Sequence, residues 1–225
     1  DMQYYIKQLY SFLDSLKKNN NREWFEAHRA DYEQLRKLWL DDLDRLIGFM
    51  SEFDPRLATL TARSCAYRIY RDTRFSNDKT PYKTFFSASI TPGGRKSPYA
   101  GYYIEIGNPT SYDQGLYGGL WCPEPRMLAK IRHAIVDNIE EWEEIINNPT
   151  LQRAFPDWCC STLKTAPKGW PKDHPQIEFL RMTNYGRVRP CTREFYLDPA
   201  WPERAAELFQ ALSPFINFLN YTIDE

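Results

Sequence analysis

The densest run of side chains able to bind charge lies between residues 68 and 83. It holds five basic residues, two acidic residues and three aromatic rings. Guanidinium groups bind carboxylate or phosphate through paired hydrogen bonds, lysine adds a point charge, and aromatic rings stack on planar ligands. We therefore expect an anion-binding pocket, whose side chains from this run are Arg68, Arg71, Arg74, Lys79, Lys83 and Tyr82.

A second basic segment, residues 164–175, is followed by Arg181 and combines lysines with glycine and histidine. We assign Lys168 and Arg181 to the same pocket. The candidates for proton transfer are His174, Asp72 and Asp78, because imidazole and carboxylate groups serve as general acids and bases. The competing interpretation is structural: the two aspartates pair with nearby arginines, and the Asp-His-Pro run forms a turn. The sequence leaves open whether segments 68–83 and 168–174 meet.

Motifs of other chemistries are missing from the chain. There is no His-Glu-x-x-His helix, zinc-type Cys/His spacing, EF-hand loop, phosphate-binding P-loop or nucleophile elbow, so the sequence predicts no metal site and no cofactor. The glycine-rich run 115–121 predicts a bulge or a close approach of the backbone to a ligand.

Net charge and cysteine content limit the partners and the compartment. The 225 residues carry a net charge of −1, but residues 61–100 hold eight basic and two acidic residues, a local charge of +6. This patch is compact and the rest of the chain is acidic overall, which disfavours nucleic-acid binding. No apolar run approaches the roughly 18 residues that span a bilayer. Five cysteines, an odd number with two adjacent, favour reduced thiols and a cytoplasmic location. The oligomeric state is left open.

Hydrophobic periodicity and turn residues predict the elements that position these groups. Residues 3–18 form a helix, and a second helix starts in an Asn20–Glu23 capping box and continues to residue 53. The remaining expectations are strands at 65–70, 84–91, 99–107 and 114–121, a helix at 123–147, a loop at 156–175, a short helix at 176–182, one or two strands within 183–196, and a last helix after Pro199 that Pro214 breaks. The fold class is α+β: a single domain, residues 1–225, with an antiparallel meander packed against or wrapped by helices.

Several segments resemble one known family in the same order. They are Leu16-Lys17-Lys18-Asn19-Asn20-Asn21-Arg22-Glu23-Trp24-Phe25, the run from Tyr70 to Lys83, Gly118-Gly119-Leu120-Trp121, and Pro167-Lys168-Gly169 with Asp173-His174-Pro175. They resemble the domain-of-unknown-function family 2461 of uncharacterised bacterial and fungal proteins. The resemblance implies one cytoplasmic α+β domain and no known activity, and it transfers no catalytic residue.

Three functional hypotheses follow. The first is a pocket that binds an anionic small molecule bearing phosphate or carboxylate, with the question of catalysis open. The second is a non-catalytic protein-interaction module that uses the basic and aromatic loop. The third is nucleic-acid binding, which predicts salt-dependent affinity for oligonucleotides.

Overall fold

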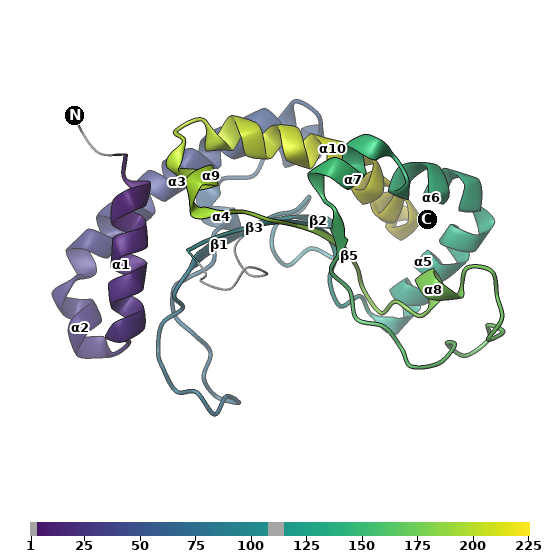
Figure 1. Cartoon of the computed structure of the whole chain (residues 1–225), viewed down its shortest axis with the longest axis horizontal. Helices are drawn as coiled ribbons and strands as arrows, with labels where there is room; N and C mark the ends of the chain where they lie inside the picture. The colour runs from purple at the N-terminus through teal and green to yellow at the C-terminus, as the bar shows by residue number, and fades with distance from the viewer. Residues whose placement is uncertain (1–3, 108–114) are drawn as a thin grey trace.

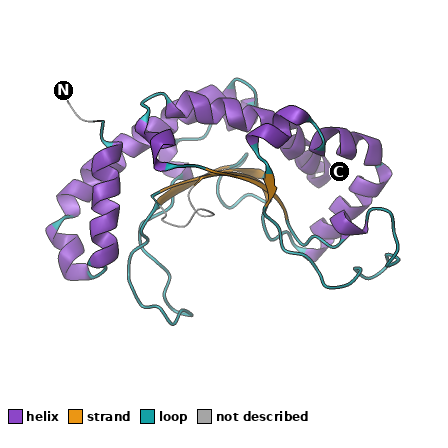
Figure 2. Cartoon of the chain, in the orientation of Figure 1, coloured by secondary structure: helices purple, strands orange, loops and turns teal. Residues whose placement is uncertain are grey.

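The computed structural model describes residues 4–107 and 115–225. An antiparallel sheet is covered on one face by helices, which confirms the predicted α+β class (Figures 1 and 2). The elements in chain order are α1 (Ile6–Lys18), α2 (Arg22–Ala27), α3 (Arg29–Ser51), the 3-10 helix η1 (Pro55–Leu57), α4 (Ala62–Cys65), β1 (Phe86–Ile90), β2 (Gly101–Ile106), β3 (Gly115–Leu120), α5 (Pro125–Asp137), α6 (Ile139–Ile146), α7 (Pro149–Ala154), β4 (Asp157–Trp158), α8 (Ile177–Leu180), β5 (Tyr185–Pro190), α9 (Arg193–Leu197) and α10 (Trp201–Asp224).

The sheet has the strand order β1-β2-β3-β5-β4, and every neighbouring pair is antiparallel. The first three strands form the predicted meander, with Ala88 opposite Ile104 and Ile104 opposite Leu116. Because residues directly opposite each other on neighbouring antiparallel strands point to the same side, these three buried side chains share one face of the sheet. That face packs against the helices, α10 above all, and forms the core.

Gly118 allows α10 to lie directly on β3. A Cβ built on Gly118 would come within 2.1 Å of the Leu212 side chain, and one built on Gly119 would come within 2.0 Å of the Tyr185 carbonyl oxygen. The glycines of this run therefore serve close packing between elements, and the predicted approach of backbone to a ligand is not what requires them.

The predicted break at Pro214 does not occur, and α10 continues through it. A proline lacks the N–H that would bond the carbonyl four residues earlier, here that of Gln210. The Ser213 hydroxyl donates to this carbonyl oxygen at 2.8 Å instead. The neighbouring serine therefore supplies the missing donor, and the helix persists.

Four other expected elements are corrected. The helix expected over 20–53 divides at His28, whose backbone is non-helical, and that over 123–147 divides at Asn138 for the same reason. The strand expected at 65–70 is replaced by α4 and isolated bridges, one of them from Ala66 to Ala88. The loop expected at 156–175 contains the short β4. Of the one or two strands expected within 183–196, one is present, β5, and α9 follows it. Helices α1, α8 and the three meander strands agree with prediction to within a few residues.

No helix in the described ranges 4–107 and 115–225 is both long enough and apolar enough to cross a bilayer.

Candidate functional site

Residues 70–82, here called the basic loop, project away from the sheet below the helices (Figure 1). Its two ends run antiparallel. Tyr70 and Tyr82 form an isolated bridge, the Arg71 N–H donates to the Pro81 carbonyl at 2.9 Å, and the Lys83 N–H donates to the Ile69 carbonyl at 2.7 Å. The chain then enters β1. The sheet edge therefore anchors the loop, and the loop carries most of the predicted site residues.

Both aspartates of the basic loop shape turns. Asp72 accepts hydrogen bonds from the Arg74 backbone N–H at 3.2 Å and from its guanidinium at 2.8 Å. Asp78 accepts from the backbone N–H of Thr80 at 2.9 Å and from its hydroxyl at 2.8 Å. Such side-chain-to-backbone bonds two residues on are typical of Asx turns. The Arg74 side chain lowers the pKa of Asp72 to about 2, and the Thr80 N–H lowers that of Asp78. Both groups stay ionised at neutral pH, so neither suits a general acid.

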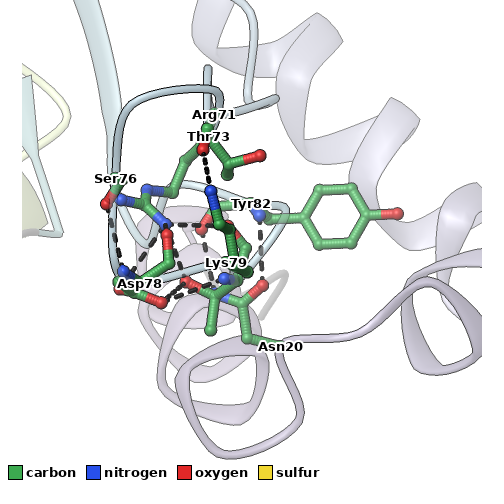
Figure 3. Close-up of polar contacts among 8 residues, drawn as sticks. Asn20, Arg71, Thr73, Ser76, Asp78, Lys79 and Tyr82 are labelled. Atoms are coloured by element: carbon green, nitrogen blue, oxygen red, sulfur yellow. Dashed lines mark hydrogen bonds and ion pairs between the residues drawn. The ribbon is translucent and has the colours of Figure 1, made fainter.

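Two cations close the loop upon itself (Figure 3). The Arg71 guanidinium donates to the Thr80 carbonyl at 2.8 Å and to its hydroxyl at 3.0 Å, and pairs with Asp78 at 3.4 Å. The Lys79 amine donates to the Thr73 carbonyl at 2.7 Å. These bonds fix the loop and leave further N–H groups of both side chains for a ligand, since arginine has five and lysine three.

Asn20 fastens the basic loop to the corner between α1 and α2. Its amide nitrogen donates to the Tyr82 carbonyl at 2.9 Å, and its amide oxygen accepts from the Tyr82 N–H at 3.1 Å (Figure 3). The Tyr82 ring stacks on Phe25 at a centroid distance of 4.1 Å and is 3% exposed. The helix cap is Asn21, whose side chain accepts from the Trp24 N–H. The predicted capping box at Asn20 is therefore wrong, and Asn20 is available for the loop.

An open cleft of about 600 Å³ lies between α2, the start of α3 and the basic loop. Arg29 pairs with Glu26, and it also donates to the Tyr70 hydroxyl at 3.3 Å. Within the described residues, the Arg22 side chain forms no hydrogen bond or ion pair. Four cations therefore face one carboxylate in a cleft lined by Arg22, Glu26, Arg29, Tyr70, Arg71, Thr73, Lys79, Pro81 and Tyr82.

Of the predicted site residues, the cleft brings together Arg71, Lys79 and Tyr82. It adds Arg22, Glu26 and Arg29 of α2 and α3, which the sequence reasoning missed. The available signal was the run of three asparagines before α2. One asparagine is enough to cap the helix, and a second one beside it indicates that its side chain bonds to another segment of the chain.

Arg74, Arg68 and Lys83 lie outside the lining of this cleft. Arg74 pairs with Asp72, and its side chain is 76% exposed. Arg68 is exposed, and Lys83 donates from its amine to the Arg68 carbonyl at 2.8 Å. The last two side chains therefore sit at the base of the loop and not at the cleft.

Lys168, His174 and Arg181 belong to the other edge of the sheet, so the composite pocket is not formed. The basic loop leads into β1, whereas residues 159–176 follow β4, and β1 and β4 are the two outermost strands. Four strand spacings separate these edges by about 19 Å, and the two segments lie apart in Figure 1. The His174 Nδ1 accepts from the Gln176 N–H at 3.0 Å, and the Arg181 Nε donates to the Leu163 carbonyl at 2.7 Å. Both side chains thus hold local turns.

The family assignment rests on nearly the whole chain. The model of a family described as conserved hypothetical proteins, DUF2461, matches residues 8–218. The chain belongs to this family. No curated protein and no solved structure gives a significant match. In this DUF2461 protein, two segments that carried the resemblance, residues 16–25 and 70–83, meet at the cleft through Asn20 and Tyr82.

Proposed function

We propose that the cleft beside the basic loop binds a small molecule bearing a phosphate or carboxylate group. The observation that carries this proposal is Arg22, a guanidinium at the first turn of α2 with no partner among the described residues, on a cleft where cations outnumber carboxylates four to one. Converging cations raise the local concentration of anions, and a guanidinium binds either group through two parallel hydrogen bonds.

The lining also favours a ligand with a planar part. Tyr70 is 44% exposed and makes an edge contact with Phe25, which holds its ring in place. An exposed aromatic ring beside guanidinium groups can stack on a flat, delocalised molecule. A phosphate or carboxylate attached to an aromatic ring or a nucleobase fits these two features together.

The proposal concerns binding and assigns no acid–base step. The cleft lining contains no histidine or cysteine. Its one carboxylate, Glu26, has its pKa lowered by the hydrogen bond from Arg29 and therefore stays ionised.

Isothermal titration with inorganic phosphate, pyrophosphate, citrate and adenosine monophosphate tests the proposal. Arg22→Gln should weaken the binding of the best ligand about 10- to 150-fold, because a charge-assisted hydrogen bond contributes about 1.5–3 kcal/mol. Arg126→Gln is the matched control, since Arg126 is an exposed arginine in the first turn of α5. Absence of binding across the panel, or equal affinity of the two variants, would refute the proposal.

A second candidate function, a protein-interaction module, is favoured by Phe75. This ring lies within the basic loop, is 94% exposed, and has the Arg74 guanidinium 5.6 Å from its centroid. Exposed aromatic and arginine side chains are typical anchors of protein interfaces. An acidic protein partner identified by affinity capture should lose most of its affinity on Phe75→Ala. If this variant and Arg126→Gln bind the partner equally, the loop is not the anchor.

For the compartment, we infer the cytoplasm from the odd number of cysteines and the adjacent pair Cys159–Cys160. Alkylation of the protein in freshly lysed cells, without reductant, should modify accessible thiols such as that of Cys122, which is exposed. Recovery of fully oxidised protein would contradict this inference.

A further inference from the structure

A second group of cations gathers around Tyr67, at the base of the basic loop. The Lys83 amine lies 5.5 Å from the centroid of the Tyr67 ring, and the Arg95 guanidinium carbon lies 5.4 Å from it. Arg68 is the next residue along the chain, and its charge acts on that of Lys83. These three cations come from separate places in the sequence, and none of them lines the cleft described above.

Backbone contacts hold this group in position. The Tyr67 N–H donates to the Ser87 carbonyl of β1 at 3.0 Å. The Lys83 amine donates to the Arg68 carbonyl at 2.8 Å, and the Arg95 guanidinium donates to the Ala66 carbonyl at 3.1 Å. The Lys83 and Arg95 side chains are therefore tied to the backbone at the edge of the sheet, and their remaining N–H groups are available to a ligand.

The positive charge of this group is not balanced by ion pairs. In the described part of the chain, Arg68, Lys83 and Arg95 form none, whereas Arg71 and Arg74 each pair with an aspartate. Among residues 4–107 and 115–225, Glu105 of β2 is the carboxylate whose charge acts on Lys83, and it also accepts from the Tyr103 hydroxyl at 2.6 Å. Within these described residues, three cations against this carboxylate leave a net charge of +2.

The pKa of the Lys83 amine reflects this excess of positive charge. Burial lowers the pKa of its amine, the charges of Arg68 and Arg95 lower it further, and the attraction to Glu105 does not compensate. An anion placed among the three cations would supply the missing counter-charge.

We propose that Arg68, Lys83 and Arg95 form a second anion site, separate from the cleft, that takes the phosphate group of a small molecule or inorganic phosphate. The Lys83 and Arg95 head groups lie against the same ring, and the charge of Arg68 acts on Lys83, so together these donors suit the several terminal oxygens of a phosphate monoester. The dianionic charge also matches the +2 of the group. A carboxylate has two oxygens and is satisfied by a single guanidinium.

Competitive labelling of lysines tests this site. The protein is treated at pH 8 with a trace of acetic anhydride, with and without inorganic phosphate, and the labelled peptides are quantified by mass spectrometry. Phosphate should slow the labelling of Lys83 at least threefold, because a bound anion raises its pKa and covers its amine. Lys172, an exposed lysine on the far edge of the sheet, is the internal reference. Equal effects of phosphate on the two lysines would overturn the proposal.

Variants separate this site from the cleft. Protection of Lys83 should disappear in the double variant Arg68→Gln with Arg95→Gln, and should persist in Arg22→Gln and in Arg126→Gln. Protection that survives the double variant, or that Arg22→Gln abolishes, would refute the site.

Calorimetry gives a second measurement that does not depend on Lys83 reacting. In the Arg22→Gln background, inorganic phosphate should still bind, and the added double substitution should abolish this binding. If the Arg22→Gln protein binds no phosphate, the second site is wrong while the cleft proposal stands. The second site is also wrong if wild type binds one inorganic phosphate per chain and Arg22→Gln abolishes this binding.

Discussion

Asn20→Ala removes the two hydrogen bonds that hold the basic loop against α2. Each hydrogen bond contributes about 0.5–1.5 kcal/mol net, so the free energy of unfolding should fall by about 1–3 kcal/mol. For a chain of this size, about 2 kcal/mol corresponds to a decrease in melting temperature of about 4–8 °C. The lost contacts join residues 62 positions apart. We therefore expect the cleft to lose its shape as well, and the affinity of its ligand to fall together with stability.

Denaturant unfolding followed by tryptophan fluorescence measures the change in stability. Asn19→Ala is the matched control, because the Asn19 amide makes one exposed hydrogen bond, to the Ser15 carbonyl at 2.9 Å. Its cost should stay below about 0.5 kcal/mol. Asn20→Asp keeps the acceptor for the Tyr82 N–H but turns a carboxylate oxygen toward the Tyr82 carbonyl, and should be at least as harmful as alanine. If Asn19→Ala destabilises the protein as much as Asn20→Ala does, the reasoning is refuted.

Three further predictions concern stability. Gly118→Ala should cost about 1–3 kcal/mol in thermal unfolding, since its Cβ would overlap the Leu212 side chain; an unchanged melting temperature would contradict the packing of α10 on β3. Ser213→Ala should cost about 1 kcal/mol in thermal unfolding followed by circular dichroism, because the Gln210 carbonyl loses its donor; no effect would show that water replaces the hydroxyl. The ion pair with Arg193 of α9 lowers the pKa of Asp14. The contribution of Asp14 to the free energy of unfolding is therefore present above the unfolded pKa and is lost as the pH falls below about 4. The difference in stability between wild type and Asp14→Asn should therefore vanish in acid, and a difference that stays constant down to pH 2 would refute this.

The meander and the long helices could be predicted because local pattern decides them. Alternating apolar residues in 84–91 and 99–107 and the Pro92-Gly93-Gly94 turn are enough to place β1 and β2. The corrections come where a distant or neighbouring group overrides the pattern. Pro214 stays helical because Ser213 donates to Gln210, a contact that the usual proline rule does not include.

The candidate site could be predicted only in part, because long-range contacts decide which of its cations lie together. The cations of the basic loop were visible as a charge cluster, but their division between the cleft and the base of the loop depends on which way each side chain turns. Arg22 and Arg29 were not assigned, because long-range contacts bring α2 to the loop: the hydrogen bonds between Asn20 and Tyr82 and the stacking of Phe25 on Tyr82. His174 and Arg181 share the composition of an anion site, yet strand order places them at the opposite edge.

The two edges of the sheet offer little room for a further strand. An open edge strand offers unpaired N–H and carbonyl groups that another chain can join, which leads to aggregation. Here β4 has only two residues, and the outer side of β1 is partly occupied by the bridge from Ala66 to Ala88 and by the bond from Tyr67 to Ser87. The segment that anchors the basic loop therefore also guards β1, and substitutions that loosen it should expose a template for intermolecular β-pairing.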